Sequence, residues 1–396
     1  MTMALARLIG KVFGAVTRSD FAREVASTES AGRFQLVRIV AVVSVAMQFG
    51  CATPPAERPV DPVTEPEWHT PESLEWASEP TLPLLDIGVV SFDPGVSDDD
   101  VSPLAAVRRL EGQLLAAELR ETLQQSNQWG VVRLLPSVSA LTPIALQTRI
   151  VFSDGRDLIL DVTARDAMGT LWFEQRIARR STLSEESEQP LGALFNVISN
   201  RLLAYWRSLA VLERQRFLDA AGLMYAQSLV PEAFSDMLAL TEEGWQLRRL
   251  PAEGDPMMAR VTRVRNQEYL FCDTVDEQYT LLEDRVGPTY ALWRQATLEQ
   301  AEWLEQYERR ASSREVKSSD SEFSRMHAQY AAYRSFRIQE QALFELAEAL
   351  DNESQPTVLQ TEDRVVSLKG TLASQYDTWR ELLREIYLLE QGSAAW

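Results

Sequence analysis

The stretch LQTRIVFSDGRDLILDVTA, residues 146–164, gives the clearest indication of how this chain folds. Two runs with alternating apolar residues flank a central Asp154-Gly155 dipeptide, which is a strong signal for a tight β-hairpin turn. In the second run every other residue from Leu158 to Ala164 is apolar. We therefore predict two antiparallel strands with one buried face and one face in water.

The strand pattern continues on both sides of this hairpin. Downstream, a turn at 166–169 leads to a third strand of the same meander. Upstream, residues 84–92 (LLDIGVVSF) predict a buried first strand, and residues 129–135 predict another strand. Between these two, Ser102 and Pro103 are preferred residues for the cap and first position of a helix. The order β-α-β-β-β-β predicts an α+β fold, a small sandwich in which the helix covers one sheet face.

The composition changes to a helical pattern from about residue 191 to the end. We expect an α+β domain over 84–182 and a mainly helical bundle over 183–396. Within the bundle, one helix should end at Gly287-Pro288, because proline disrupts a helix interior. A last helix over 358–389 carries a heptad pattern, which fits either a coiled-coil seam or ordinary packing within the chain.

Aromatic residues are frequent in the helical half, and most of them should be core. One stretch differs, because Tyr333, Arg334, Phe336 and Arg337 place aromatic rings beside guanidinium groups. Aromatic residues and arginine dominate protein-binding sites. These four residues are therefore our candidate partner-binding face.

The N-terminal segment has the features of an export signal. Cys51 follows a short apolar run, residues 39–50, that arginines precede. Gly50-Cys51 resembles the bacterial lipobox, in which the cysteine takes a lipid and becomes the mature N-terminus, although Gln48 and Phe49 depart from that motif. We predict that residues before Cys51 are a leader and export signal and that Cys51 is the lipidation site. Plain secretion or an uncleaved anchor is the alternative.

Residues 51–83 follow this signal and hold eight of the chain's eighteen prolines and no glycine. Such a composition favours an extended, semi-rigid spacer. The residues after Cys51 are Ala52 and Thr53 rather than aspartate, which in Gram-negative lipoproteins implies export to the outer membrane. We expect a lipid-anchored protein on the periplasmic side of that membrane; a secreted periplasmic or an inner-membrane-anchored protein is the alternative.

Charge and rare residues narrow the classes of function. The net charge is −19, and the first fifty residues are net basic, so the remainder is more acidic still. This argues against nucleic acid as a partner, because phosphate backbones require a positive face. The chain has two histidines, His69 in the linker and His327 in the helical half. This number argues against catalysis or metal binding by histidine side chains. We expect no cofactor, no metal site and no enzymatic activity.

At two other positions we expect a structural role rather than a functional one. Asp93-Pro94-Gly95 follows the first strand, where α/β proteins often place ligands, but no glycine-rich phosphate motif accompanies it, so we expect a turn. Cys272 lies at an apolar-to-polar boundary and should be a small buried residue rather than a reactive thiol.

Segment 84–180 resembles the small α+β domain of the CsgG and LpoB types of lipoprotein and of the N-terminal domain of TolB. The residues that carry the resemblance are IGVVSF at 87–92, the helix over 114–123, WGVV at 129–132 and the hairpin at 153–155. The resemblance covers about a quarter of the chain and implies partner-binding or assembly roles without catalytic residues.

These features together favour a non-enzymatic, membrane-anchored lipoprotein that binds protein partners in assembly of the cell envelope. Two alternatives stay open. One is an oligomeric accessory subunit of secretion or export. The other is a carboxylate-based hydrolase of cell-wall glycan, since paired acidic side chains are numerous.

Overall fold

The computed structural model describes residues 66–97, 99–182, 191–241, 244–252 and 254–313, together with 330, 337, 341, 357–360, 365–368 and 371–393. Cys51, the predicted lipidation site, and the predicted leader lie outside the described residues, and so do Tyr333, Arg334 and Phe336. Arg337 is described and is helical with an exposed side chain.

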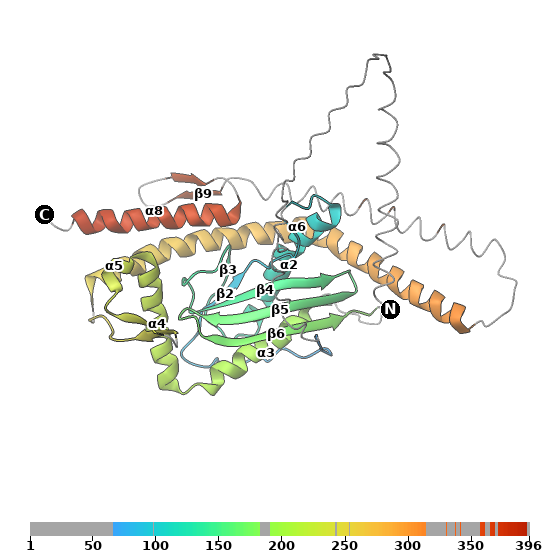
Figure 1. Ribbon diagram of the computed structural model, residues 1–396, viewed down its shortest axis with the longest axis horizontal. Coiled ribbons are helices and arrows are strands. Elements are labelled where there is room, and N and C mark those ends of the chain that lie inside the picture. Colours follow the sequence, from blue (N-terminus) through green and yellow to red (C-terminus); the bar gives the residue numbers. More distant parts are fainter. Residues whose placement is uncertain are drawn as a thin grey trace, which may run out of the picture. The chain divides into compact units, whose positions relative to one another are not determined.

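A six-stranded mixed sheet forms the framework of the fold (Figure 1). Its strands, in spatial order, are β1 (Glu67–Trp68), β6 (Leu171–Arg180), β5 (Asp157–Asp166), β4 (Ile144–Ser153), β2 (Ile87–Val90) and β3 (Val132–Leu135). β4, β5 and β6 are antiparallel, whereas β2 is parallel to both of its neighbours and β1 is parallel to β6. Helices accompany this sheet, so the predicted α+β class is confirmed.

The predicted hairpin joins β4 to β5. The Asp154 carboxylate accepts the backbone N–H groups of Arg156 and Asp157 at 3.0 and 2.8 Å, which closes the turn. Gly155 lies at φ +84°, a conformation that glycine adopts without steric cost. The local sequence therefore fixes the register of β4 and β5.

The meander has one buried and one open face, as its alternation predicts. Leu158, Leu160 and Val162 of β5 are fully or almost fully buried. On the opposite face Arg176 of β6 donates to both carboxylate oxygens of Asp161 at 2.6 and 2.7 Å. This bidentate pair is partly exposed, so it contributes more to the register of the strands than to the free energy of unfolding.

The remaining elements are helices and two small hairpins. The helices are α2 (Pro103–Gln125), α3 (Gly192–Ser208), α4 (Val211–Leu229), α5 (Pro231–Phe234), α6 (Pro256–Ser313) and α8 (Leu372–Ser393). The hairpins are β7 (Leu238–Thr241) with β8 (Gly244–Leu247), and β9 (Thr357–Gln360) with β10 (Val365–Leu368).

Helix α2 begins as the sequence predicts. The Ser102 hydroxyl accepts the Ala105 N–H at 3.3 Å, and Pro103 is the first helical residue. Further along, the backbone N–H of Phe92 donates to the Gly112 carbonyl at 3.0 Å. A Cβ at position 112 would lie 2.6 Å from the Phe92 carbonyl oxygen, so glycine is required where α2 crosses the end of β2.

One hydrophobic cluster joins the sheet to the helical half. Trp206 of α3, Phe271 of α6 and Trp379 of α8 are completely buried in it. Trp172 of β6 stacks on the rings of Tyr205 and Trp206, with centroids 4.4 and 6.1 Å apart. The core therefore continues without a break from the sheet into the helices that follow it.

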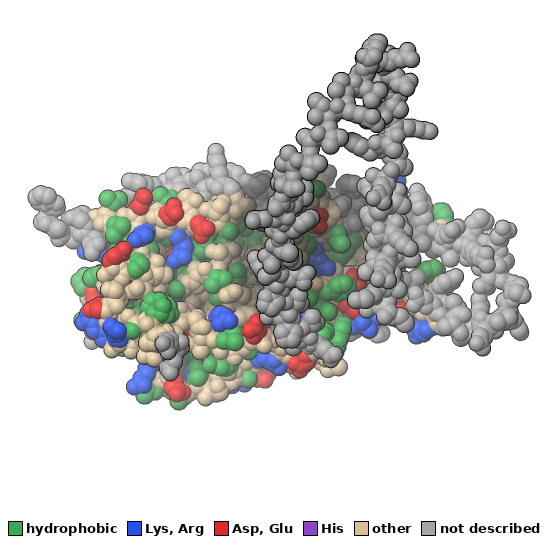
Figure 2. Space-filling model, in the orientation of Figure 1, with side chains coloured by type: hydrophobic (Ala, Val, Ile, Leu, Met, Phe, Trp, Pro, Cys, Tyr) green, Lys and Arg blue, Asp and Glu red, His purple; other side chains and the backbone are tan. Residues whose placement is uncertain are grey.

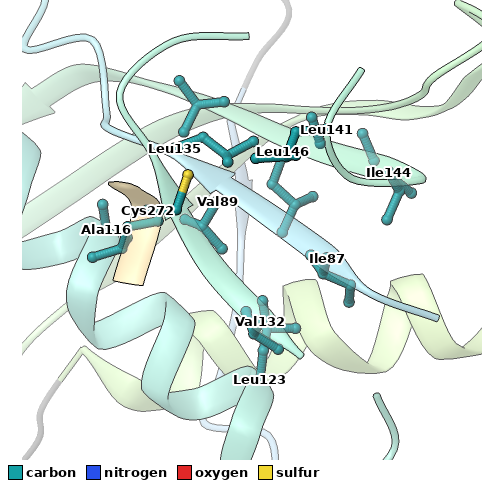
Figure 3. Packing of buried hydrophobic residues seen from close by; sticks show 14 of the residues in the cluster. Ile87, Val89, Ala116, Leu123, Val132, Leu135, Leu141, Ile144, Leu146 and Cys272 are labelled. Atoms are coloured by element: carbon teal, nitrogen blue, oxygen red, sulfur yellow. The ribbon is translucent and has the colours of Figure 1, made fainter. Parts of the chain in front are cut away.

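Cys272 lies within this shared core, as predicted. Its side chain is fully buried and close to the apolar side chains of β2 and β3 (Figure 3). Burial raises the thiol pKa well above its ordinary value. It is a packing residue that stays protonated.

Helix α6 does not end at Gly287-Pro288, so that prediction is wrong; the helix continues to Ser313. Val286, Tyr290 and Trp293 flank the proline and are buried against α2. Each such side chain contributes roughly 1.5–3 kcal/mol on burial, and together they outweigh the roughly 3 kcal/mol cost of an internal proline.

The C-terminal prediction is wrong in its first part. Residues 357–360 and 365–368 form the β9–β10 hairpin, and α8 begins only at Leu372. The hydrophobic residues that α8 buries are Leu372, Tyr376, Trp379, Leu383 and Tyr387, whereas Leu389 of the predicted heptad is exposed. α8 packs along α6 of the same chain (Figure 1).

Residues 66–83, the second part of the predicted linker, lie against the folded body. The His69 N–H donates to the backbone of β6 at 2.9 Å. Asn200 of α3 then accepts the Glu75 N–H at 2.9 Å and donates to the Ser73 carbonyl at 3.0 Å. We call residues 66–83 the strap.

Among the described residues, no helix combines the length and the apolar character that a membrane span requires.

Candidate functional site

A groove of about 220 Å³ lies where β2 ends and α2 begins. This is the edge at which α/β sheets commonly bind ligands. Its lining residues are Pro94, Gly95, Val96, Asp100, Ser102, Leu104, Ala105 and Arg108, with Ile150 and Val151 from β4.

The floor of the groove is made of backbone. Beyond β2, the Asp93 N–H donates to Thr148 and the Ile150 N–H donates to Asp93, both at 2.8 Å. The Asp93 carboxylate accepts the Gly95 N–H at 2.8 Å, and Gly95 lies at φ +67°. A Cβ there would lie 2.3 Å from the Ile150 carbonyl oxygen. The predicted turn at 93–95 is confirmed, and it is seated against β4.

The loop that closes the groove is held by arginine and aspartate. Arg109 donates to the carbonyl oxygens of Ser97 and Asp100 at 2.9 and 2.7 Å. The Asp100 carboxylate accepts the Ser102 N–H at 2.9 Å, and hydrogen bonds from Ser102 lower its pKa. These contacts tie the described residues of the loop to the start of α2.

Arg108 connects the groove to a buried polar network. It donates to the Ser153 carbonyl and to the Glu111 carboxylate, whose side chain is 1% exposed. Glu111 also accepts the hydroxyls of Ser153 and Tyr290, both at 2.8 Å, and Arg294 donates to the Tyr290 hydroxyl at 3.0 Å. Both carboxylate oxygens of Glu111 thus accept hydrogen bonds, and the network links α6 to α2.

A second buried carboxylate, Glu268, links the N-terminal half of α6 to α4 and α8. Glu268 is completely buried and accepts the hydroxyls of Tyr225, at 2.8 Å, and Tyr376. The Arg380 guanidinium lies 3.3 Å away, and the Tyr376 hydroxyl also lies 2.9 Å from Ser139. Burial, and then the nearby Glu268 charge, raises the pKa of both tyrosines, so they remain donors.

A third set of acids lies at the contact of α2 and α6. Burial raises the Glu118 pKa to about 7, Glu283 and Glu121 add to the rise, and Arg294 opposes it. Among the described residues, no group of three or more histidine, cysteine or acidic side chains has the geometry to hold a metal ion.

The rim of the groove is apolar and exposed. Leu104 and Val151 line the groove, Val101 precedes the lining residue Ser102 and Phe152 follows Val151; all four apolar side chains are exposed. Contiguous exposed apolar side chains mark sites that bind proteins, membranes or ligands. The arrangement suits contact with an apolar side chain or an extended segment.

Arg337, the one described member of the sequence-based partner-binding face, is not among the residues that line the groove. Arg337 is exposed on a helix, and the other three members of that face are not described. The groove was missed, although the apolar pair Val101 and Leu104 beside the helix cap was a local signal for it. His69 was assigned to a spacer, but its side chain is only 10% exposed and its Nε2 lies 3.9 Å from Glu67.

Neither a scan against protein-family models nor a search of curated proteins gave a match for this chain. The functional argument therefore rests on the geometry of the groove and its surroundings.

Proposed function

We propose that this chain is a non-enzymatic, membrane-anchored lipoprotein that binds protein partners in the bacterial envelope. A lipid on Cys51 holds it at the periplasmic side of the outer membrane, and the groove at the end of β2 receives a partner. In this proposal the sandwich of sheet and α2 and the helices that follow are two binding modules of one body.

The observation that carries the proposal is the exposed apolar rim on a rigid support. Leu104 is the second residue of a capped helix, and Val151 lies in the ten-residue strand β4. The loop between them is held by Arg109 and Asp100. A preorganised surface of this kind binds without a large entropic cost of ordering.

The state of the buried acids favours partner binding over glycan hydrolysis. A glycosidase needs two carboxyl groups that flank a substrate bond. Glu111 and Glu268 are 1% and 0% exposed and are surrounded by hydroxyl and guanidinium donors. These contacts support a structural role for both carboxylates.

The strap sets the reach of the proposed anchor. If residues 66–83 stay on the body, 14 residues separate Cys51 from Pro66. A chain of that length spans at most roughly 50 Å. In this proposal the groove would then bind its partner close to the membrane into which the lipid is inserted.

Affinity purification of the full chain from the native envelope, after brief cross-linking, tests the proposal. The comparison uses wild type, Leu104→Asp and Leu212→Asp. Leu212 is the matched control, because it is also an exposed leucine at the second position of a helix. The Leu212 side chain is 63% exposed and the Leu104 side chain is 55% exposed. Aspartate suits both helix N-termini.

We expect Leu104→Asp to lose partners that Leu212→Asp retains. The same set of proteins recovered with both variants would refute the groove as the binding site. Recovery of only further copies of this chain would instead support the oligomeric export subunit.

A further inference from the structure

Side-chain amides of the body hold the backbone of the strap. Asn200 of α3 accepts a strap N–H at 2.9 Å and donates to a strap carbonyl at 3.0 Å, both within residues 73–75. Asn196, one turn earlier, donates to the preceding carbonyl at 2.8 Å, and Asn127, just after α2, donates to the carbonyl of Ala77 at 2.8 Å. Because any extended chain offers such N–H and carbonyl groups, these contacts recognise a backbone conformation rather than particular side chains.

The side chains of the central strap bury little surface. Between residues 70 and 79 only Leu74 and Ala77 are partly buried, and none is fully buried. Trp76 is 65% exposed. Hydrogen bonds worth about 0.5–1.5 kcal/mol each therefore hold this part of the strap, without the apolar burial that stabilises the core. Such a segment can detach while the rest of the fold stays closed.

The Glu75 side chain is recognised by charge. Arg207, in the last turn of α3, donates to the Glu75 carboxylate at 2.7 Å. Elsewhere the visible face of the molecule mixes hydrophobic, acidic and basic side chains (Figure 2), so we expect this local ion pair, rather than a broad field, to select a ligand. We call Asn127, Asn196, Asn200 and Arg207 the strap-binding face.

We propose that the strap-binding face is a site for an extended, acidic segment of a partner protein, and that the strap occupies it until that segment displaces it. The face offers hydrogen bonds to backbone and an arginine for one carboxylate, which suit a partner segment as well as the strap. The strap of a second copy fits less well, because mutual exchange of two identical straps gains no new contact. No residue of this face lines the groove, so the inference goes beyond the proposed function.

Displacement of the strap would also change the reach of the proposed anchor, a consequence that rests on lipidation of Cys51. With residues 66–83 detached, 32 residues separate Cys51 from Leu84, in place of the 14 that precede Pro66. A chain of that length spans at most roughly 110 Å, about twice the reach with the strap in place. Partner binding at this face would therefore let the body move farther from the membrane.

Fluorescence anisotropy with the full chain tests the proposal. The probe is a labelled peptide with the sequence of residues 66–83. The receptor is Glu75→Pro, because proline removes both the N–H that Asn200 accepts and the carboxylate that Arg207 contacts, while the strap-binding face stays intact. A second receptor adds Asn200→Ala to this change, and its matched control adds Asn266→Ala, which alters an exposed asparagine on α6.

We expect the peptide to bind Glu75→Pro and its Asn266→Ala control within about twofold of each other. Asn200→Ala should weaken binding at least about tenfold, because two hydrogen bonds are lost. Wild type should also bind at least about tenfold more weakly than Glu75→Pro, because its own strap competes at a high effective concentration. Equal affinity for the Asn200→Ala and Asn266→Ala receptors, or no binding to Glu75→Pro, would overturn the proposal.

Two altered peptides test what the face recognises. The Trp76→Ser peptide should bind within about twofold of the original, because that side chain is exposed on the bound strap. The Glu75→Lys peptide should bind several-fold more weakly, because it places a second cation beside Arg207. The opposite order of the two affinities would overturn recognition through backbone and charge.

Sedimentation of the peptide-free proteins tests the second copy as occupant. We expect wild type and its Asn200→Ala variant to sediment alike. A wild-type dimer that dissociates on Asn200→Ala would assign the face to the strap of a second copy and overturn the proposal. None of these readouts depends on Cys51 or Leu104, so this inference and the proposed function can fail separately.

Discussion

Asp276, in the middle of α6, accepts the backbone N–H of Leu134 in edge strand β3, with 2.9 Å between Oδ1 and N. One turn earlier, Asp273 accepts a hydrogen bond from Arg133 at 3.0 Å. Unpaired N–H groups on an edge strand invite pairing with other chains. Helix α6 therefore closes this edge of the sheet with a side-chain acceptor as well as with its bulk.

Replacement of Asp276 by alanine should leave the Leu134 N–H without its acceptor. We expect the free energy of unfolding to fall by about 1–3 kcal/mol, the cost of a buried unsatisfied donor. Asp273→Ala is the control, because Asp273 is 55% exposed and its ion pair is worth at most about 1 kcal/mol. Urea denaturation measures both, and equal losses would contradict the role given to Asp276.

Glu118 should make stability depend on pH near neutrality. Its folded pKa is about 7 against an ordinary 4.5, so the folded chain retains a proton that the unfolded chain releases. The stability that this proton provides is complete below pH 4.5 and is lost as pH rises through about 7.

Glu118→Gln should therefore be more stable than wild type at pH 8, by about 1–3 kcal/mol, and similar to it at about pH 4.5. Glu299→Gln, an exposed position on α6, should show no such difference. Denaturant titrations at several pH values measure both variants. If the free energy of unfolding of Glu118→Gln differed from that of wild type by the same amount at every pH, Glu118 would not be the titrating group.

The strap should detach from the folded body more often when the Asn200 side chain, which holds it, is removed. Asn200→Ala deletes two hydrogen bonds to strap backbone, at Glu75 and Ser73. We expect limited proteolysis within 66–83 to accelerate several-fold, because cleavage follows the population of the open form. Asn266→Ala, an exposed position on α6, is the control. Unchanged cleavage in both variants would show that other contacts suffice.

Lipidation at Cys51 predicts where the protein fractionates. Wild type should sediment with outer membranes, and its N-terminal peptide should carry the mass of a lipid. Cys51→Ala should abolish the lipid and release the protein, whereas Cys272→Ala should leave it membrane-bound, because that thiol is buried packing. Two results together would contradict the lipoprotein assignment. They are a Cys51→Ala protein that stays in the membrane and a wild-type N-terminal peptide whose mass includes no lipid.

Local signals predicted the sheet and α2. Asp154-Gly155 fixed one hairpin, and Ser102-Pro103 fixed one helix start, because each acts within a few residues. The α+β class followed from their order. Such signals do not depend on what the rest of the chain does.

Long-range contacts explain what the sequence did not reveal. Helix α6 passes through Pro288 because Val286 and Trp293 are buried against α2, far away in sequence. The strap resembles a spacer until Asn200, 125 residues later, meets Glu75. The groove likewise needs β4 beside the loop after β2, and the local signal at Val101 and Leu104 does not reveal that long-range contact.

The most direct test of the central claim, partner binding at the groove, is site-specific photo-cross-linking in the native envelope. A photoreactive residue replaces Leu104 in one protein and Leu212 in another, both in the full lipid-bearing chain. We predict a discrete cross-linked protein from position 104 and none from position 212. No product from position 104, or the same products from both positions, would contradict the account.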